Sequence, residues 1–549
     1  MSDIEKKAIK LFNNKKFKDS FNLFAIILKS NPNSIKAHLF SAYCCIEFRN
    51  YELALKFLNE LDKSIKIPEV FYYKGVCLNY LKQNDQAIKN YKKAISLKKD
   101  YFEPYIQLGH LYKNIDKLDE SLEILLNGLK YAQQKELIHT NISEIYYLKK
   151  QYDLSIKHAR EALKSNKNNY FAVINLANSF MEQGLVEKGV EELENVATQN
   201  NISIIYNNLG FGYKLLGKYE KAISNYQKAI SLNPNNHEAF FNLSHIQLSL
   251  NNFQEGWLNY ERRWGTKKFA YKRLDIKKPL WNSKLGYGRV LIWAEQGIGE
   301  QILFSSIIPE LRSKFKKILI AVNDKLVPLF KERFAGIEVC PISKKINEND
   351  FDFHLPIGSL GRYFRSDRKS FSENFIQNSN RRPTNIKNKK FKCAISWISS
   401  NNEFQKNKSI KLNDLVDILC IKEFEFFNVQ YTDVQKEVDS FFNNHNILIN
   451  DIGDIDPYND LLNLNKFLIS CDFLITVSNT TAHLAAAAGI PTYLLLPQQK
   501  GSFWYWSNEY NDKNLWYPSV VKFQQKHEGN WVEPIKNLKI YLENKYKIN

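Results

Sequence analysis

A carboxylate and two glycines occupy a segment in which an expected strand turns into an expected helix. The apolar run from Val290 is followed by Glu295, Gln296, Gly297, Gly299 and Glu300. Glycines allow a tight turn and let backbone N–H groups approach a ligand, and the amino terminus of a helix favours anions. The spacing is not G-x-G-x-x-G, so it does not favour dinucleotide binding. Glu300 either takes part in chemistry or only stabilises the helix dipole.

A second segment brings hydroxyl, amide and imidazole groups to the start of another expected helix. After the apolar run Leu474–Val477 come the polar residues Ser478, Asn479, Thr480, Thr481 and His483. Such residues are also ordinary helix caps. Four of them with a histidine are more than a cap requires, and together they are suited to hold a diphosphate and a ribose.

Both segments belong to a half of the chain in which short apolar runs alternate with helical stretches. The predicted strands are Val290–Ala294, Ile318–Val322, Ile337–Ile342, Phe353–Ile357, Cys393–Ile398, Phe424–Val429, Leu474–Val477 and Thr492–Leu496. This alternation predicts parallel sheets covered by helices. With a break near Arg381–Pro383, we expect two Rossmann-like domains, 289–385 and 386–549, facing one another across a ligand cleft. Residues 265–288 are predicted to be a connector.

The first half of the chain repeats every 33 or 34 residues. Small residues recur at Ala8, Ala42, Gly75, Gly109, Ser143, Ala177, Gly210 and Ser244, and a second set follows twelve positions later at Ser20, Ala54, Ala87, Ser121, Ser155, Gly189, Ala222 and Gly256. Antiparallel helices approach closely only where small side chains meet. Ile205–Asn236 also resembles the tetratricopeptide consensus. We therefore expect eight helical hairpins over residues 1–264, forming an α-solenoid with a concave groove.

Four repeats carry an asparagine two positions before the first small residue, at Asn141, Asn175, Asn208 and Asn242. An amide donates and accepts at once, which suits the backbone of an extended peptide. A similar ladder is found in the repeats of O-linked N-acetylglucosamine transferases, although asparagine is also common here in ordinary repeats. The expected partner in the groove is a protein or peptide.

From about Pro279 onward, several further segments agree in order and spacing with one family. They are Trp281, Glu295–Glu300, Phe353-His354 with Ser359-Leu360, Ile395–Trp397, Lys408–Ile410, Gln430, Thr480–Ala486, Trp516–Pro518 and Phe523-Gln524. In these the chain resembles the glycosyltransferase-like domain of bacterial tetratricopeptide proteins related to heptosyltransferases, glycosyltransferase family 9. The resemblance implies a GT-B architecture, a nucleotide-sugar donor held mainly by the last domain, and catalysis without a metal or another cofactor.

The resemblance also implies roles for individual residues. Glu300 stands where the family has the base that deprotonates the acceptor hydroxyl, on an acceptor-side loop formed by Glu295, Gln296, Gly297 and Gly299. Lys406 and Lys408 lie near the family's basic segment and would neutralise the departing diphosphate, and Ser409 beside them would also bind the donor. Ser478–Thr481 and His483 would complete the donor pocket.

Three positions depart from the family pattern. The family commonly has Asp at the positions of Ser478 and Glu300, and Arg at the position of Lys408; lysine cannot form arginine's bidentate fork. Two functions therefore remain open. One is a glycosyltransferase whose repeats recruit an acceptor, such as flagellin, another surface protein or a surface glycan. The alternative is a non-catalytic interaction scaffold with a degenerate transferase domain.

Composition narrows the remaining function classes. Lys and Arg outnumber Asp and Glu by 77 to 58, giving a formal charge of +19. This excess either attracts an anionic partner or reflects a lysine-rich composition, since no dense basic tract stands out. No nucleic-acid module is recognised, so nucleic acid is not an expected partner.

The cysteines and the apolar runs indicate the compartment. The seven cysteines are scattered and include no C-x-x-C, which favours a reducing environment over disulfides or zinc. No secretory signal is visible, and the longest apolar stretch, Ala482–Pro497, is too short to span a bilayer. We expect a cytoplasmic protein without a transmembrane segment.

Three other patterns allow two interpretations each. Asp350 and Asp352 imitate the D-x-D of metal-dependent glycosyltransferases but are more simply surface residues before a strand. The acidic segment Asp451–Asp456 lacks the spacing of a calcium loop. The aromatic residues Phe503–Trp506 with Trp516 and Tyr517 either stack on a sugar or a base or pack beneath the sheet.

Overall fold

The computed structural model describes residues 3–132, 135–267, 269, 271–371, 390–400, 404–510 and 513–548. The chain forms two compact units, Met1–Asn200 and Asn201–Asn549. The break predicted near Arg381–Pro383 and Lys268 of the predicted connector lie outside the described residues. In the part of the chain that is described, no helix has the length and apolar character needed to cross a membrane.

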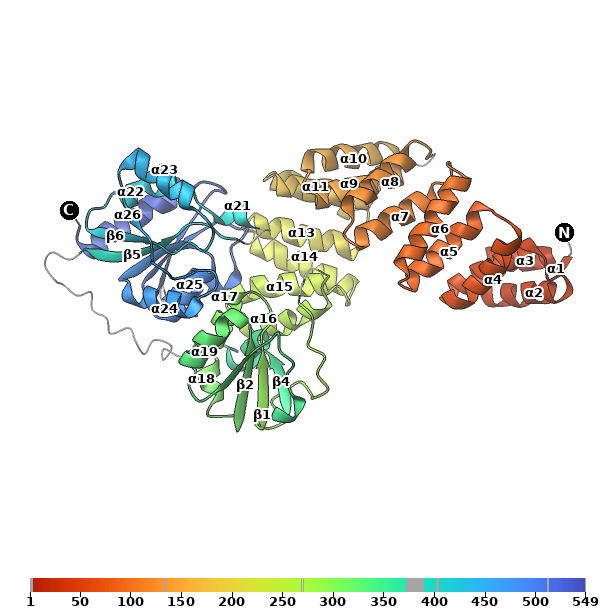
Figure 1. Cartoon of the computed structure of the whole chain (residues 1–549). Coiled ribbons are helices and arrows are strands. Elements are labelled where there is room, and N and C mark those ends of the chain that lie inside the picture. The colour runs from red at the N-terminus through yellow and green to blue at the C-terminus, as the bar shows by residue number, and fades with distance from the viewer. Residues whose placement is uncertain are drawn as a thin grey trace. The chain divides into compact units, whose positions relative to one another are not determined.

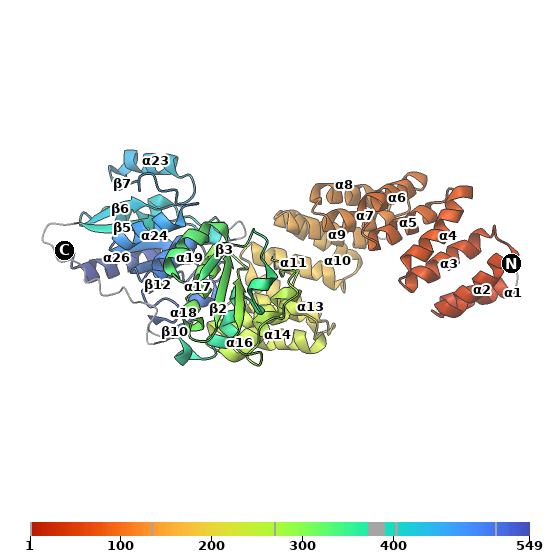
Figure 2. The ribbon, with the colours of Figure 1, turned by 60° about the horizontal axis from the view of Figure 1, so that its bottom comes forward.

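The first unit consists of antiparallel helical pairs that follow one another along the chain (Figures 1 and 2). Its helices are α1 (Asp3–Asn13), α2 (Phe17–Ser30), α3 (Ile35–Glu47), α4 (Tyr51–Ser64), α5 (Pro68–Tyr80), α6 (Asn84–Leu97), α7 (Glu103–Asn114), α8 (Leu118–Leu129), α9 (Lys135–Leu148), α10 (Tyr152–Ser165), α11 (Tyr170–Glu182) and α12 (Val186–Ala197). This agrees with the predicted helical solenoid.

The two sets of small residues meet where the helices of a pair cross. Ser121 Oγ donates to the Gly109 carbonyl oxygen at 2.8 Å, and Ser20 repeats the contact with the Ala8 carbonyl oxygen at 2.9 Å. A Cβ on Gly75 would lie 2.7 Å from the ring of Tyr91. The twelve-residue offset between the two sets of small residues therefore marks the close crossings of paired helices, as the sequence predicts.

Each pair turns through one residue with a positive φ angle. These residues are Lys15, Arg49, Lys82, Asp116, Lys150, Gly184, Gly217 and Asn251. A left-handed residue after a helix satisfies the last carbonyls and reverses the chain. Most of these positions are not glycine, so the turns give only a weak signal in the sequence.

The second unit begins with two more helical pairs. They are α13 (Ser203–Leu215) with α14 (Tyr219–Leu232) and α15 (His237–Ser249) with α16 (Phe253–Tyr260), and the short 3-10 helix η1 (Glu261–Gly265) follows. The ring of Tyr226 packs against Gly210 as Tyr91 does against Gly75. The repeat architecture thus continues into the unit that contains the sheets.

The first sheet is entirely parallel and has the order β3-β2-β1-β4. Its strands are β1 (Arg289–Trp293), β2 (Lys317–Val322), β3 (Glu338–Pro341) and β4 (Phe353–Pro356), and its helices are α17 (Ile298–Ser305), α18 (Ile308–Leu311), α19 (Val327–Arg333) and α20 (Leu360–Phe364). All four strands coincide closely with predicted ones.

The second sheet is also parallel and has the order β12-β9-β8-β5-β6-β7. Its strands are β5 (Phe391–Ser396), β6 (Phe424–Asn428), β7 (Ile449–Asn450), β8 (Phe473–Val477), β9 (Thr492–Leu496) and β12 (Val520–Gln524). The helices are α21 (Gln405–Lys408), α22 (Val416–Leu419), α23 (Gln435–His445), α24 (Leu461–Ser470), α25 (Thr480–Ala487) and α26 (Val532–Tyr546), and β10 (Glu509–Tyr510) pairs with β11 (Lys513–Asn514).

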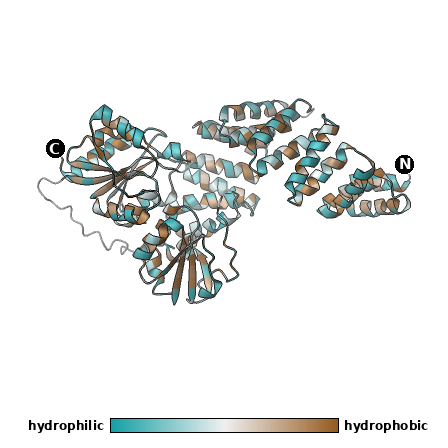
Figure 3. Cartoon of the chain, in the orientation of Figure 1, coloured by the Kyte–Doolittle hydropathy of each residue, from teal (hydrophilic) through white to brown (hydrophobic). Residues whose placement is uncertain are grey.

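This order is that of a doubly wound sheet. The chain adds β6 and β7 on one side of β5 and then returns to add β8 and β9 on the other side, so the switch point lies between β5 and β8. Ligands of such folds bind outside the carboxyl ends of the strands at this switch point. The central strands β8 and β9 are buried along their whole length, and Figure 3 shows the strands of both sheets as predominantly hydrophobic. The second half of the chain is thus an α/β region with parallel sheets, as expected.

One hydrophobic core joins the last repeat to both sheets. Trp257 of α16 is 1% exposed and contacts Trp504 edge-on, with 5.4 Å between ring centroids. Its indole N–H donates to the carbonyl oxygen of Arg365 at 2.8 Å. Trp504, Trp506 and Trp516 belong to the same core. Most of the aromatic cluster that the sequence left open between ligand stacking and packing is therefore packing.

Candidate functional site

The loop after β1 carries the first motif and leads into α17. Gln296 adopts a φ angle of +73°, which is uncommon for a residue other than glycine and marks a constrained turn. The carbonyl oxygen of Gln296 accepts a hydrogen bond from Gln301 Nε2 at 3.1 Å. Gly297 is the N-cap and has an extended conformation, so α17 begins without a side-chain cap. Glu300 occupies the first turn of this helix.

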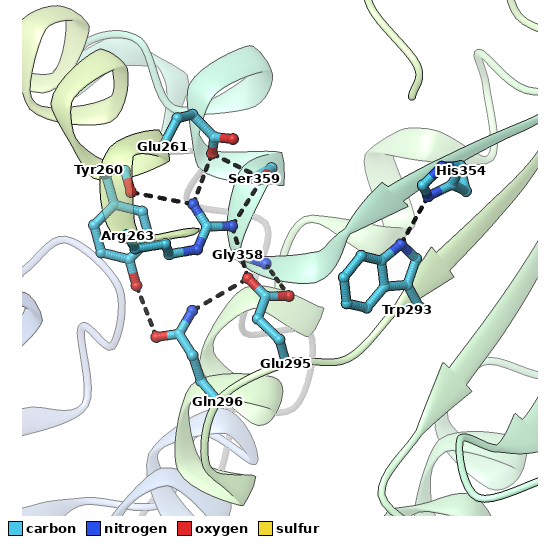
Figure 4. A network of polar contacts seen from close by, with 9 residues as sticks. All are labelled: Tyr260, Glu261, Arg263, Trp293, Glu295, Gln296, His354, Gly358 and Ser359. Carbon is cyan, nitrogen blue, oxygen red and sulfur yellow. Dashed lines mark hydrogen bonds and ion pairs between the residues drawn. The ribbon is translucent and has the colours of Figure 1, made fainter. Parts of the chain in front are cut away.

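The loop is tied to the end of the repeat array by buried polar contacts (Figure 4). Arg263, in η1, is fully buried and donates to Glu295 at 2.8 Å and to Ser359 at 2.9 Å. Tyr260 donates its hydroxyl to Gln296 Oε1 at 2.7 Å. Glu295 and Gln296, predicted on an acceptor-side loop, thus have side chains committed to holding that loop.

The Arg263–Glu295 pair is buried, and each group shifts the pKa of the other toward its charged form. Burial acts to lower the pKa of Arg263, but the carboxylates of Glu295 and Glu261 outweigh it, so the pKa is raised. Burial raises the pKa of Glu295, and Arg263 opposes that shift. A short hydrogen bond between charged groups favours the ionised pair.

A pocket of about 370 Å³ opens at the carboxyl ends of β1 and β2. Its floor includes the loop residues Glu295, Gln296 and Gly297, and its wall includes Tyr271 and Lys272. The wall residues come from the segment that the sequence treated only as a connector. This segment therefore helps to shape a site as well as linking two parts of the chain.

The two predicted motifs, nearly two hundred residues apart, lie against each other. A Cβ on Gly299 would stand 2.6 Å from Cδ2 of His483, and α17 packs on α25. Tyr505, in the 3-10 helix η8 (Trp504–Trp506), donates its hydroxyl to Glu300 Oε1 at 3.1 Å and contacts the His483 ring at 5.2 Å. The carboxylate from the first α/β region thus contacts Tyr505 of the second, which in turn packs on His483.

Lys408 is the basic residue of this site. It is 3% exposed, and its ammonium lies 4.7 Å from the centre of the Phe503 ring. Burial lowers the pKa of Lys408 to about 8, and Glu300 opposes that shift. Among the described residues its ammonium has no hydrogen bond or ion pair. Gly501 packs against its aliphatic stem, with a Cβ there standing 2.7 Å from Cγ.

The two other residues of this predicted segment, Lys406 and Ser409, lie in surroundings that differ from those of Lys408. Lys406 is exposed on α21. The Ser409 hydroxyl accepts a hydrogen bond from the backbone N–H of Ser399 at 3.1 Å, which holds the loop after β5. The structure therefore singles out Lys408 from the three residues of this predicted basic segment.

The Ser478–Thr481 turn lies at the switch point and is partly occupied by contacts within the chain. Ser478 Oγ accepts from the indole of Trp506 at 3.0 Å. Asn479 caps α25 by accepting from the N–H of Ala482 and donates to Ser396 Oγ at 2.9 Å. Thr480 begins the helix. Thr481 is 1% exposed, and its hydroxyl has no partner among the described residues.

His483 is a neutral, hydrogen-bonded core residue at this helix start. Its Nδ1 pairs with the Tyr517 hydroxyl at 2.9 Å, and it is 3% exposed. Burial lowers the pKa of His483 to about 3, and Lys408 lowers it further. The imidazole can thus act on a ligand as a neutral group and not as a cation near neutral pH.

Gln430 organises the same switch point, although no separate role was predicted for it from the sequence. Its Oε1 accepts from Ser396 Oγ, from the N–H of Trp397 and from the N–H of Ile398, at 2.9 to 3.1 Å. The loop after β5 is thereby held beside the start of α25, where Asn479 also bonds to it. Tyr505 was missed as well, because nothing in its local sequence indicates which carboxylate it contacts.

The asparagine ladder uses its amides within the chain. In the first unit, Asn175 Nδ2 donates to the Thr140 carbonyl oxygen at 3.1 Å, and Asn141 Nδ2 donates to that of Leu137 at 2.7 Å. In the second unit, Asn208 donates to its own helix and Asn242 to Asn207 of the preceding repeat. All four are partly exposed. Each amide retains a second N–H, so peptide binding by the ladder stays a prediction.

The acidic patterns do not form metal sites in the described part of the chain. Asp352 Oδ1 accepts a hydrogen bond from Arg289 Nη2 at 2.7 Å. This contact holds the pKa of Asp352 at about 2, below its ordinary value. The described residues contain no cluster of three or more potential metal ligands. The D-x-D resemblance therefore reflects a surface ion pair at the start of β1.

Comparison with known families identifies the repeats. Tetratricopeptide repeat families match residues 78–116, 138–169, 203–236 and 225–257. The chain therefore contains tetratricopeptide repeats, which supports a role in protein interaction.

Curated relatives extend this similarity beyond single repeats. The chain is 25% identical over 314 residues to Protein FlbA of Caulobacter vibrioides, and the match covers 52% of each chain. It is 24% identical over 126 residues to human Tetratricopeptide repeat protein 6, covering 23% of this chain and 24% of that protein. The chain thus spans about half the length of FlbA and a quarter of the human protein.

Solved repeat structures resemble parts of the chain. One is the C-terminal part of a repeat-containing protein from Cytophaga hutchinsonii, with 18% identity, a TM-score of 0.36, and coverage of 44% of this chain and 99% of that one. Another is a tetratricopeptide repeat protein from Parabacteroides merdae, with 13% identity, a TM-score of 0.38, and coverage of 44% and 96%.

Proposed function

We propose that this protein is a glycosyltransferase of GT-B type that moves a sugar from a nucleotide-sugar donor to an acceptor recruited by its repeats. The observation that carries the proposal is the approach of the Glu300 loop to the start of α25, where Gly299 packs on His483, Tyr505 bonds to Glu300, and Glu300 acts electrostatically on Lys408. A carboxylate, a buried cation and a helix amino terminus are the groups that sugar transfer requires.

The donor would lie at the switch point of the second sheet. Thr481 offers a buried hydroxyl that has no partner among the residues that the structure describes, and such groups are rare in proteins unless a ligand or water satisfies them. Lys408 is held nearby with its ammonium unpaired among the described residues, so a diphosphate would gain a charged hydrogen bond there. The start of α25 adds backbone N–H groups.

The acceptor would enter from the pocket at the end of β1. Its hydroxyl oxygen attacks the anomeric carbon of the donor sugar while Glu300 takes the hydroxyl proton. The bond between that carbon and the diphosphate oxygen breaks, and Lys408 meets the charge that develops on the diphosphate. The hydroxyl proton thus passes to Glu300, and the electron pair of the broken bond stays on the diphosphate beside Lys408.

A second candidate, an interaction scaffold without catalysis, is favoured by a different observation. The Tyr505 hydroxyl donates a hydrogen bond to one oxygen of Glu300, and the Trp506 indole donates to the hydroxyl of Ser478. The Tyr517 hydroxyl is hydrogen-bonded to His483. These contacts close part of the site with groups from one neighbouring segment. The tetratricopeptide repeats would then carry the whole function.

Ligand binding separates the two candidates. Saturation-transfer NMR on the full chain with UDP-, GDP-, ADP- and CMP-sugars should detect a bound nucleotide sugar. Transfer measured with that donor and extracts of surface proteins should be lost in E300Q. The control E423Q changes an exposed glutamate in the second α/β region. Absence of any donor binding would leave the scaffold as the function.

A further inference from the structure

A continuous row of aromatic rings runs across the first repeats. The rings of Phe40, Tyr43, Tyr73, Tyr72 and Tyr101 contact one another in that order, and we call them the aromatic face. The centroid separations are 5.7, 4.3, 4.8 and 5.3 Å. The residues lie on α3, on α5 and just before α7.

The aromatic face remains accessible to solvent. None of its residues is fully buried, although rings such as Tyr91 and Phe24 in the same repeats are. A row of large rings that folding leaves half-covered is a typical feature of a binding surface. Phenols add a polar edge, which suits contact with a peptide.

Glutamates border this face. Glu47 and Glu69 stand four positions from Tyr43 and Tyr73 on α3 and α5, and Glu103 opens α7. Spacing of four places two side chains on one side of a helix. In the described part of the chain these three glutamates make no ion pair and no side-chain hydrogen bond. The nearby Lys74 is engaged elsewhere, with Asp62 at 2.7 Å.

The electrostatic effect of these carboxylates converges on one phenol. Burial raises the pKa of Tyr73, and Glu103, Glu69 and Glu47 raise it further. The face thus carries three acidic side chains in a chain whose formal net charge is +19. These carboxylates indicate which ligands the face complements.

We infer that the aromatic face with Glu47, Glu69 and Glu103 binds an extended segment of a partner protein that carries arginine or lysine side chains. A cation is attracted to the face of an aromatic ring, and a guanidinium also donates to carboxylates. In the described part of the chain, unpaired glutamates beside a row of tilted and edge-on phenol rings provide both interactions. The inference does not rest on sugar transfer, since it concerns only repeats of the first unit.

The test measures peptide binding to the full chain by fluorescence anisotropy, with no sugar donor present. The probe is a short fluorescein-labelled peptide in which arginine alternates with serine and glycine. We expect saturable binding, and binding weaker by about tenfold when citrulline replaces arginine, since charge and cation–π attraction are lost. A glutamate-bearing peptide should not bind.

Variants locate the binding. E69Q/E103Q should weaken binding by about tenfold, and Y73L by about fivefold. The matched control E123Q/E187Q removes the same charge from exposed positions on other repeats and should bind as the parent does. Circular dichroism verifies folding. Equal binding of the citrulline peptide, an equal loss in the control or no binding by the parent would overturn the inference, whereas E300Q should bind normally.

Discussion

Gly299 and His483 touch so closely that no side chain fits between them: a Cβ on Gly299 would stand 2.6 Å from the imidazole. The second glycine of the E-Q-G-I-G-E loop thus serves helix packing between two α/β regions. At Gly297 the nearest obstacle is Oε2 of the flexible Glu300 side chain, at 2.8 Å, and φ is −70°. The two glycines are therefore not equivalent.

Replacing them separately should reveal this difference. G299A forces His483 or α17 to shift, and overpacking of this kind costs about 1–3 kcal/mol in the free energy of unfolding. G297A should cost less than about 1 kcal/mol, because a flexible carboxylate can move aside. Urea denaturation of both variants decides the matter, and equal losses would contradict a packing role for Gly299.

The buried Arg263–Glu295 pair should be strongly coupled. R263M leaves the buried carboxylate of Glu295 without its cation, so it should lower the free energy of unfolding by about 3–5 kcal/mol, whereas E295L leaves Arg263 its contact with Glu261 at 2.8 Å and should cost less. The double variant R263M/E295L should recover much of that loss. Chemical denaturation gives all three values. Additive losses in the double variant would show that the two residues act independently.

Stability should depend on pH through His483. Its folded-state pKa of about 3 lies below the ordinary 6.5, so the unfolded chain binds a proton between these values while the folded chain does not. Stability from this residue is therefore complete above pH 6.5 and is lost as the pH falls. H483N should reduce the slope of stability against pH by up to about 1.4 kcal/mol per pH unit. An unchanged slope between pH 6 and 4 would contradict the assignment.

Donor affinity should follow the charge of Lys408. Because its pKa is about 8, the ammonium is present below that pH and is lost above it. Calorimetry with UDP, GDP and ADP should show weaker binding above the pKa than below it. K408R keeps its charge and should show no such loss, whereas K408M should bind at least about tenfold more weakly at both. A parent profile as flat as that of K408R would exclude Lys408 as the diphosphate contact.

Local patterns predicted the elements of this fold well. The small-residue sets anticipated the crossings seen at Gly109 and Ser121, and the apolar runs anticipated β1 and β9. β7 and β12 were missed, because the first has two residues and the second follows an aromatic segment without a clear alternation.

The site was predicted less completely, for a physical reason. The two motifs could be found from turn chemistry, but their contact through Gly299 depends on the packing of helices distant in sequence. In the local sequence, Arg263 looks like part of an ordinary repeat end, and Tyr505 looks like part of an aromatic cluster. Their partners, Glu295 and Glu300, are fixed only by the shared core.

The place of α16 has a consequence for how such proteins can be recombined. An exchange of repeats joined at residue 264 would remove Trp257 from the core that it shares with Trp504. A junction before Ser203 would leave that core complete. The part of the chain that must be kept together with the sheets thus includes the last two hairpins. New binding specificity is most readily acquired by replacing the repeats that precede them.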